Sequence, residues 1–296
     1  METQQTERTN PKGTGNNWLY EYNTDNYMDI NNPHIRRAKL DLLKSGYTTF
    51  KRTSDITWTV LATVLFPVAF FNILSHSSLS DVPMVLSGLL LGLVFADFMS
   101  GLVHWMADTW GTLEVPFFGP TFIRSFREHH VSPTAMCEHD WFETNGDNFM
   151  LVVFPLYSIA SKNFDELTYL SYFGAAFLFS TSFGVSLTNQ IHKWSHTRNL
   201  SPFISFLQNN YIILPKENHT LHHRPAFDGY YCITTGWLNP LLEYISFWKK
   251  AEAVVSKLTG LKPREDDWKW TGLVNASPDV VNKYLQEKEK QNSKNQ

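Results

Sequence analysis

Histidines in this sequence occur at spacings that composition does not explain. The chain has 11 histidines among 296 residues, and at that frequency an HxxHH triplet is expected on the order of 0.02 times by chance. On a helix, residues three and four positions apart share one face, so such patterns direct two or three side chains toward one point. The patterns are HxxxD at His104 and Asp108, HH at His129 and His130, HxxxH at His192 and His196, and HxxHH at His219, His222 and His223.

These patterns predict a metal site, because neutral imidazole is a good ligand for iron, copper and zinc. One zinc ion uses four protein ligands, or three and a water, so the nine histidines between residues 104 and 223 exceed one such site and match two metals. Two neighbouring metals with weakly charged ligands suit dioxygen activation, so we expect two iron ions. The predicted ligands are His104, His129, His130, His139, His192, His196, His219, His222 and His223. Asp108 is predicted to be an acidic ligand or the acceptor that orients a ligating histidine.

Three other polar residues need an interpretation. His34 and His76 lie far from the patterns and are interpreted as structural. Asp97 interrupts an apolar stretch, where a buried charge is costly and needs a partner or a cavity. Asp97 is therefore either a functional group or a hydrogen-bonded residue of helix packing, and the sequence does not separate the two.

The elements that carry the histidines are predicted to be membrane helices. Three apolar stretches have about 20 residues, which is long enough to cross a hydrocarbon core of about 30 Å, whereas a fourth, within 148–161, is short for a span. We expect an all-α integral membrane protein with four transmembrane helices at about 57–75, 83–105, 148–161 and 167–188. Residues 232–248 are apolar but broken by Gly and Pro, so they are predicted to be interfacial or re-entrant. The expected division is an arm over 1–52, a transmembrane domain over 53–250 and a polar tail over 251–296.

The distribution of Lys and Arg predicts the orientation. Six of these residues lie in the approach to the first span, between Arg36 and Arg52, whereas the two connectors on the other side hold only Lys162. The positive-inside rule then places both termini and the histidine-rich cap in the cytosol. Two cysteines, Cys137 and Cys232, fit a reducing compartment. The start of the chain lacks the pattern of a cleavable signal peptide, and a net charge of −3 without a basic face gives no indication of nucleic-acid binding.

These clusters resemble a known family. Together with GLVHW at 101–105 and ETNGDN at 143–148, they resemble the Kua/CarF family of plasmanylethanolamine desaturases over roughly residues 50–250. The resemblance implies oxygen-dependent 1′,2′-desaturation of the alkyl chain of a plasmanyl (ether) phospholipid, which yields the vinyl ether of a plasmalogen. It also implies a multi-pass protein of the endoplasmic reticulum membrane, with electrons from cytochrome b5 and its reductase. Asp108 and Phe126 stand where other membrane desaturases have histidines, and His139 is the candidate for the missing ligand.

Several alternatives remain open at this stage. An acyl-lipid desaturase or a lipid hydroxylase would use the same di-iron site, and the mass of the product would distinguish desaturation from hydroxylation. A zinc-binding or zinc-transporting membrane protein would need ionisable groups in the middle of several spans, whereas here Asp97 is nearly alone. A purely structural scaffold leaves the histidine patterns unexplained.

Overall fold

The computed structural model describes residues 47–112, 115–116, 118–131, 133–163, 169–223 and 228–263. All regular secondary structure within these residues is helical, as the apolar patterns predicted. The α-helices are α2 (Thr49–His76), α3 (Val82–Trp110), α4 (Arg124–Val131), α5 (Trp141–Ala160), α6 (Tyr169–His196), α7 (Pro202–Asn209), α8 (Lys216–His222), α9 (Asn239–Tyr244) and α10 (Phe247–Thr259). Short helical turns are η4 (Leu79–Asp81), η5 (Gly119–Ile123) and η6 (Ala135–Glu138).

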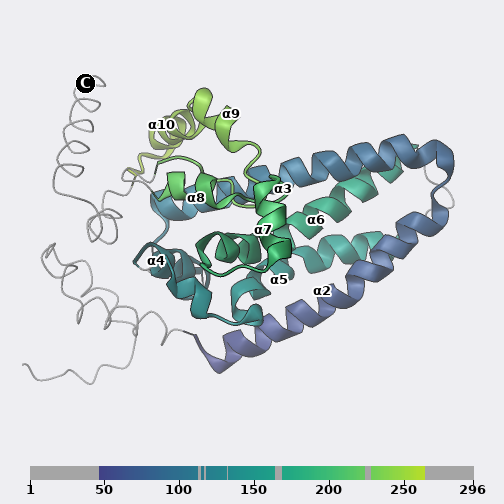
Figure 1. Ribbon diagram of the computed structural model, residues 1–296, viewed down its shortest axis with the longest axis horizontal. Helices are drawn as coiled ribbons and strands as arrows, with labels where there is room; N and C mark the ends of the chain where they lie inside the picture. The colour runs from purple at the N-terminus through teal and green to yellow at the C-terminus, as the bar shows by residue number, and fades with distance from the viewer. Residues whose placement is uncertain are drawn as a thin grey trace, which may run out of the picture.

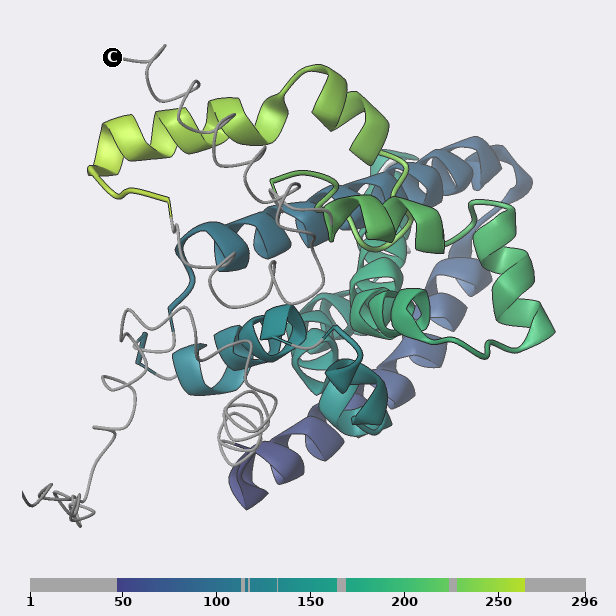
Figure 2. The same cartoon turned by 60° about the vertical axis from the view of Figure 1, so that its left-hand side comes forward.

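Four long helices form an elongated bundle. Helix α6 packs along both α3 and α5, and α2 packs along α5. The short helices α4, α8, α9 and α10 gather at the end of the bundle opposite the α2–α3 connection (Figure 1). The turned view keeps α4 and α10 at that same end (Figure 2). The histidine patterns lie in α3, α4, α6 and α8, so the fold brings separate parts of the sequence to one end of the bundle.

Side-chain caps explain where several helices begin. The hydroxyl of Thr48 accepts a hydrogen bond from the Lys51 amide at the start of α2, and Asp140 accepts two backbone amides at the start of α5. Ser201 caps α7 in the same way. These bonds satisfy amides that a first helical turn leaves without a partner. Helix α10 ends at Gly260, whose φ of 74° is a left-handed conformation that glycine adopts readily.

Small residues let α3 and α6 approach closely. Gly88 and Gly92 on α3 lie directly against the α6 backbone, and Gly184 on α6 lies against Ala96. The hydroxyl of Thr181 donates to the Gly92 carbonyl at 3.1 Å. Rows of small residues allow helix backbones to pack closely where lipid provides no hydrophobic driving force. Gly88, Gly92 and Gly184 therefore have this packing role between α3 and α6.

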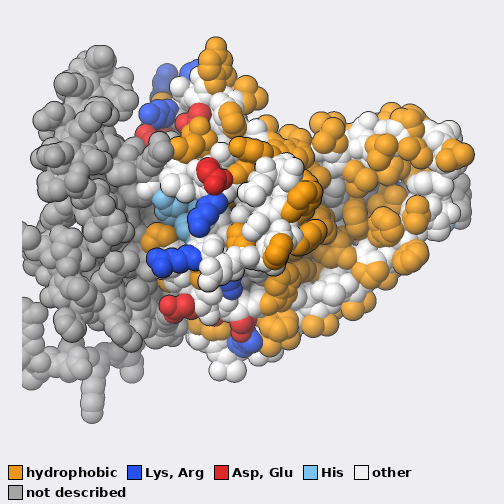
Figure 3. All heavy atoms as spheres, in the orientation of Figure 1, with side chains coloured by type: hydrophobic (Ala, Val, Ile, Leu, Met, Phe, Trp, Pro, Cys, Tyr) orange, Lys and Arg blue, Asp and Glu red, His pale blue; other side chains and the backbone are white. Residues whose placement is uncertain are grey.

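Three of these helices are long and apolar enough to cross a membrane, namely Thr49–His76, Leu79–Trp110 and Tyr169–His196. In Figure 3 hydrophobic side chains cover the part of the bundle near the α2–α3 connection, and the Lys, Arg, Asp and Glu side chains gather at the other end. The protein is thus a helical membrane protein. Helix α5 has 20 residues and is not among the three, so the fourth crossing stays a prediction.

Several observed boundaries differ from the predicted ones. Helices α2 and α6 extend beyond the apolar stretches 57–75 and 167–188 into polar residues, because backbone hydrogen bonding continues where apolarity stops. Within 232–248 the structure has an irregular segment and then α9. The predicted polar tail from 251 begins inside α10, an amphipathic helix whose Trp248 is buried. Residues 1–46 and 264–296 lie outside the described part of the chain.

The α3–α6 contact gives a test of the fold. A Cβ atom at Gly92 would meet the Ser180 hydroxyl and the Phe177 carbonyl at less than contact distance, whereas one at Gly174 would meet nothing. Alanine favours a helix over glycine by about 1 kcal/mol, so Gly174→Ala is expected to leave the melting temperature unchanged or raised. Gly92→Ala is expected to lower it, as measured by thermal unfolding in detergent. Equal melting temperatures for the two variants would contradict the close packing.

Candidate metal centre

Five histidines form the larger of two groups of potential metal ligands. One ring nitrogen or other ligand atom from each residue lies within 4.8 Å of those of the other members. The Nε2 atom of His219 is central, at 2.9 Å from Nε2 of His192, 2.6 Å from that of His196 and 2.9 Å from that of His223. The fifth member is His129, whose Nε2 lies 3.0 Å from that of His223. The group therefore joins α4, α6 and α8 at one point.

The smaller group consists of His104, Asp108 and His222. The Asp108 carboxylate oxygen lies 3.2 Å from Nε2 of His104 and 3.6 Å from Nε2 of His222. All three side chains are buried. The i, i+4 spacing on α3 places His104 and Asp108 on one face of the helix, as the sequence pattern predicted.

The two groups adjoin each other. The His104 and His192 ring centroids are 5.7 Å apart, and those of His219 and His222 are 5.6 Å apart. Burial and the neighbouring imidazoles lower the pKa of His219 well below its ordinary value, which keeps the ring neutral as a ligand must be. Three Nε2 atoms surround Nε2 of His219, and hydrogen bonds among the rings cannot satisfy all four nitrogens at once. A bound cation could accept their lone pairs instead. The donor set therefore fits a metal cofactor.

Backbone carbonyls orient two of the histidines. Nδ1 of His104 lies 3.1 Å from the Tyr231 carbonyl oxygen, and Nδ1 of His222 lies 2.9 Å from the Gly229 carbonyl oxygen. Because a carbonyl only accepts, each Nδ1 carries a proton, and Nε2, the nitrogen that faces Asp108, is the atom available to a metal. Such partners fix the tautomer and the ring orientation of metal ligands.

The segment that carries these carbonyls, residues 229–239, is here called the strap, and Asp97 holds it to α3. The Asp97 carboxylate accepts the backbone N–H groups of Thr235 at 2.7 Å, Gly236 at 2.8 Å and Leu238 at 3.1 Å. Two interpretations of Asp97 were left open, and these bonds confirm the one in which it is a hydrogen-bonded packing residue. The role of the strap could not be predicted from the sequence, because its carbonyls are backbone groups and leave no side-chain signature.

Further bonds fasten the strap. The Asn239 side chain pairs with both backbone groups of Cys232, each at 2.9 Å, and the Ser100 hydroxyl accepts the Ile233 amide at 3.0 Å. A Cβ atom at Gly101 would come within 2.6 Å of the Cys232 sulfur, so the glycine of the GLVHW string allows this close approach. The strap is therefore fixed along more than one turn of α3.

Of the two remaining predicted ligands, only His139 has a described side chain. His139 donates from Nδ1 to Glu143 at 2.9 Å and lines a small cavity of about 60 Å³ together with His129 and His192. It is therefore close to the larger group without being part of it. His130 belongs to α4, but its side chain is outside the described ones.

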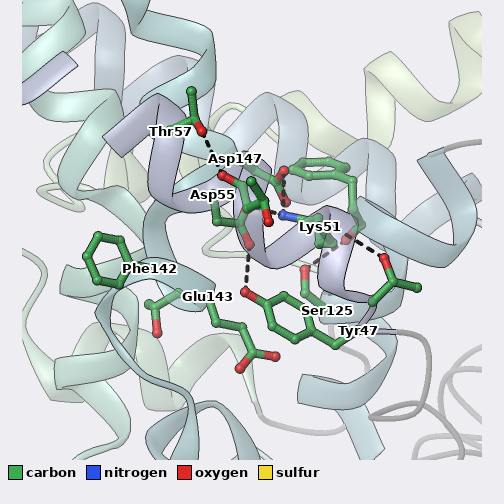
Figure 4. A network of polar contacts seen from close by, with 12 residues as sticks. Tyr47, Lys51, Asp55, Thr57, Ser125, Phe142, Glu143 and Asp147 are labelled. Atoms are coloured by element: carbon green, nitrogen blue, oxygen red, sulfur yellow. Dashed lines mark hydrogen bonds and ion pairs between the residues drawn. The ribbon is translucent and has the colours of Figure 1, made fainter. Parts of the chain in front are cut away.

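The ETNGDN string joins three long helices near the metal centre. Asn145 donates to Gln190 and Asn148 to the Val185 carbonyl, both on α6. Asp147 reaches α2, where the Lys51 ammonium lies 2.9 Å from it and 2.5 Å from Asp55, as Figure 4 shows. The string therefore aligns α5 with α2 and α6.

Tyr47 also belongs to this network, through a hydrogen bond to Asp55. The Tyr47 hydroxyl donates to Asp55 at 2.8 Å and points at it in Figure 4. Lys51 and Asp55 are buried, and breaking a buried ion pair costs about 3–5 kcal/mol because one charge is left uncompensated. The network is thus a strong constraint on the end of the bundle that carries the histidines.

An apolar cavity of about 250 Å³ lies beside the metal centre, between α3, α5 and α6. Phe126 and Asn189 line both this cavity and the small polar one that contains His129 and His192. The Phe126 ring centroid is 5.6 Å from that of His104. Phe126, which replaces a histidine of the usual pattern, thus separates the apolar cavity from the ligands.

The fold and site define a helical membrane protein with a histidine-rich metal centre at one end of its bundle and an apolar cavity next to it. Residues 93–266 match the lipid desaturase domain. The chain therefore belongs to the lipid desaturase family and is an oxidoreductase.

Individual relatives agree with this assignment. The chain is 42% identical to mouse plasmanylethanolamine desaturase 1 over 232 residues, which cover 77% of this chain and 86% of the relative. It is 40% identical to the plasmanylethanolamine desaturase of Myxococcus xanthus over 234 residues, covering 79% and 82%. Identity to the chloroplastic fatty acid desaturase 4 of Arabidopsis thaliana is 25% over 184 residues, covering 60% and 55%. No solved structure gives a significant match.

The strap generates a prediction about metal retention. Asp97→Ala leaves three buried N–H groups without their acceptor, at about 1–3 kcal/mol each, and releases the carbonyls that orient His104 and His222. We expect the purified variant to retain less metal than the parent protein, as measured by inductively coupled plasma mass spectrometry. Asp81→Ala, at the opposite end of α3, is the matched control and is expected to keep the full content. Full metal content in Asp97→Ala would refute the role of the strap.

Proposed function

We propose that this protein introduces the 1′,2′ double bond into the alkyl chain of plasmanyl phospholipids and so forms plasmalogens. The observation that carries the proposal is the convergence of eight ligand-type side chains next to an apolar cavity. Identity to two plasmanylethanolamine desaturases is 42% and 40%, against 25% to 30% for relatives named as fatty acid desaturases. The ether-lipid substrate is therefore favoured over an acyl lipid.

The metal ligands in this proposal are the eight clustered side chains, with one ion in each group. His104, Asp108 and His222 would hold one iron, and the five-histidine group would hold the other. Two irons there would supply the dioxygen chemistry that removes hydrogen from an unactivated C–H bond. His130 and His139 remain proposed ligands that either iron could recruit, and His139 lies nearer the larger group.

The protein's own residues would position the chain and exclude water. Phe126 presents an apolar ring between the cavity and His104, so the reacting methylenes would approach the ligands from a dry side. The strap and the Lys51 network would hold the ligands in place while no side chain needs to act as a nucleophile. Positioning is thus the chief contribution of this chain.

The overall reaction fixes what must be supplied from outside. Two hydrogens leave the alkyl chain of the lipid as one of its C–C bonds becomes C=C, and dioxygen is reduced to two waters. That reduction needs two further electrons and two protons. We propose cytochrome b5 and its reductase as the electron source, with the protein crossing the endoplasmic reticulum membrane four times, α5 being the third span. Both termini and the metal centre would then face the cytosol.

Lipid mass spectrometry tests this function. Cells lacking the endogenous gene would express either the parent protein, His222→Ala or His76→Ala at equal levels. Removing a ligand is expected to cost more than the roughly 10–100-fold that loss of a ligand's partner costs. Vinyl ether lipids should therefore fall by more than about 100-fold in His222→Ala, whereas His76→Ala, at the far end of α2, should match the parent.

The mass of the product separates the alternatives. Loss of two hydrogens from the ether lipid supports desaturation, and gain of one oxygen would instead establish a hydroxylase. New double bonds confined to acyl chains would establish an acyl-lipid desaturase. Unchanged vinyl ether lipids in His222→Ala would refute the proposed function altogether.

A further inference from the structure

We propose that the lipid's alkyl chain enters sideways from the membrane between α3 and α5 and lies along α6 in the apolar cavity. This inference rests on the proposed function and adds the route and the position of the chain. It also identifies Leu178 and Thr181 as residues that set the chain length accepted.

The first argument is how the long helices pack. Helix α6 packs along α3 and along α5, but α3 and α5 do not pack along each other. Both nevertheless contribute walls to the same cavity. The bundle therefore has an open side whose floor is α6 and whose two rims are α3 and α5.

The second argument is the exposure of the rims. Phe95 on α3 and Leu151 on α5 line the cavity and are also 41% and 55% exposed. Residues that face both a cavity and the outside lie at its mouth. The neighbouring surface of α3 is apolar and belongs to a helix long enough to cross the membrane, so the mouth opens toward lipid.

The third argument is the shape and polarity of the cavity. Its walls run from Phe95 to Val103 on α3 and from Leu178 to Asn189 on α6. At a rise of ~1.5 Å per residue these rows extend over roughly 12–17 Å. A volume of about 250 Å³ with mostly apolar walls fits a hydrocarbon chain and not a head group.

Only one end of the cavity adjoins the metal ligands, and this predicts which end of the lipid's alkyl chain lies there. Phe126 and Asn189 stand at the end next to His129 and His192. Leu178 and Thr181 line the other end, nearer the start of α6. The carbons next to the ether oxygen would therefore lie at Phe126, and the methyl end would reach Leu178 and Thr181.

The test changes the far end and leaves the metal ligands intact. Thr181→Phe should fill the cavity and Leu178→Ala should enlarge it. Purified variants would receive an equimolar mixture of plasmanyl lipids whose alkyl chains differ by two methylenes, and mass spectrometry would give the product ratio. We expect Thr181→Phe to shift the ratio toward the shorter chain by about tenfold, in the range that a hydrophobic pocket provides per methylene. Leu178→Ala should shift it toward the longer chain.

Gly174→Leu is the matched control, because this position on α6 opens onto empty space and should leave the ratio unchanged. A second measurement does not depend on turnover. Native mass spectrometry of the purified protein, without an electron donor, should show Thr181→Phe retaining less of the longer plasmanyl lipid than the parent retains, and Gly174→Leu should retain as much.

The outcomes separate this inference from the function it rests on. If the parent protein forms vinyl ethers and both cavity variants keep the parent's product ratio, the chain does not lie in this cavity, although the function stands. If the parent protein forms no vinyl ether from any plasmanyl lipid, the proposed function itself fails. A parental ratio for Gly174→Leu together with opposite shifts in the two cavity variants supports the inference.

Discussion

The structure depends on holding buried imidazoles close together at one end of a membrane bundle. Such rings cannot all be protonated there, because burial and mutual repulsion disfavour the charged form, as the lowered pKa of His219 indicates. They come from α3, α4, α6 and α8, so no local interaction keeps them together. The surrounding polar structure must therefore impose the arrangement, and a bound metal would then stabilise it.

Two polar systems outside the ligand set do this. The strap gives His104 and His222 their acceptors and is fixed by Asp97 on the same helix as His104. The ETNGDN string ties α5 to α6, whose last turns carry His192 and His196, and to α2 through Lys51. In both systems, buried charged groups hold the helices and the ligands in place and take no part in the reaction.

Much of the site could be predicted from the sequence, because ligands on one helix face follow a fixed spacing. This holds for His104 with Asp108 and for His192 with His196. The placement of His139 could not be predicted so well, since its approach depends on the loop before α5 and on its bond to Glu143. The role of Asp97 also needed the fold, because its partners are amides about 140 positions along the chain. Helical spans could be expected from apolar length, whereas helix ends could not, since they depend on caps such as Asp140.

The central claim is that two adjoining groups of ligands bind a pair of irons. X-ray absorption spectroscopy at the iron edge, on protein purified after expression with iron, measures it directly. We expect two irons per chain, nitrogen and oxygen ligands in the first shell and an iron–iron scattering vector. A single iron without that vector, or zinc as the only metal in protein that desaturates ether lipids, would contradict it.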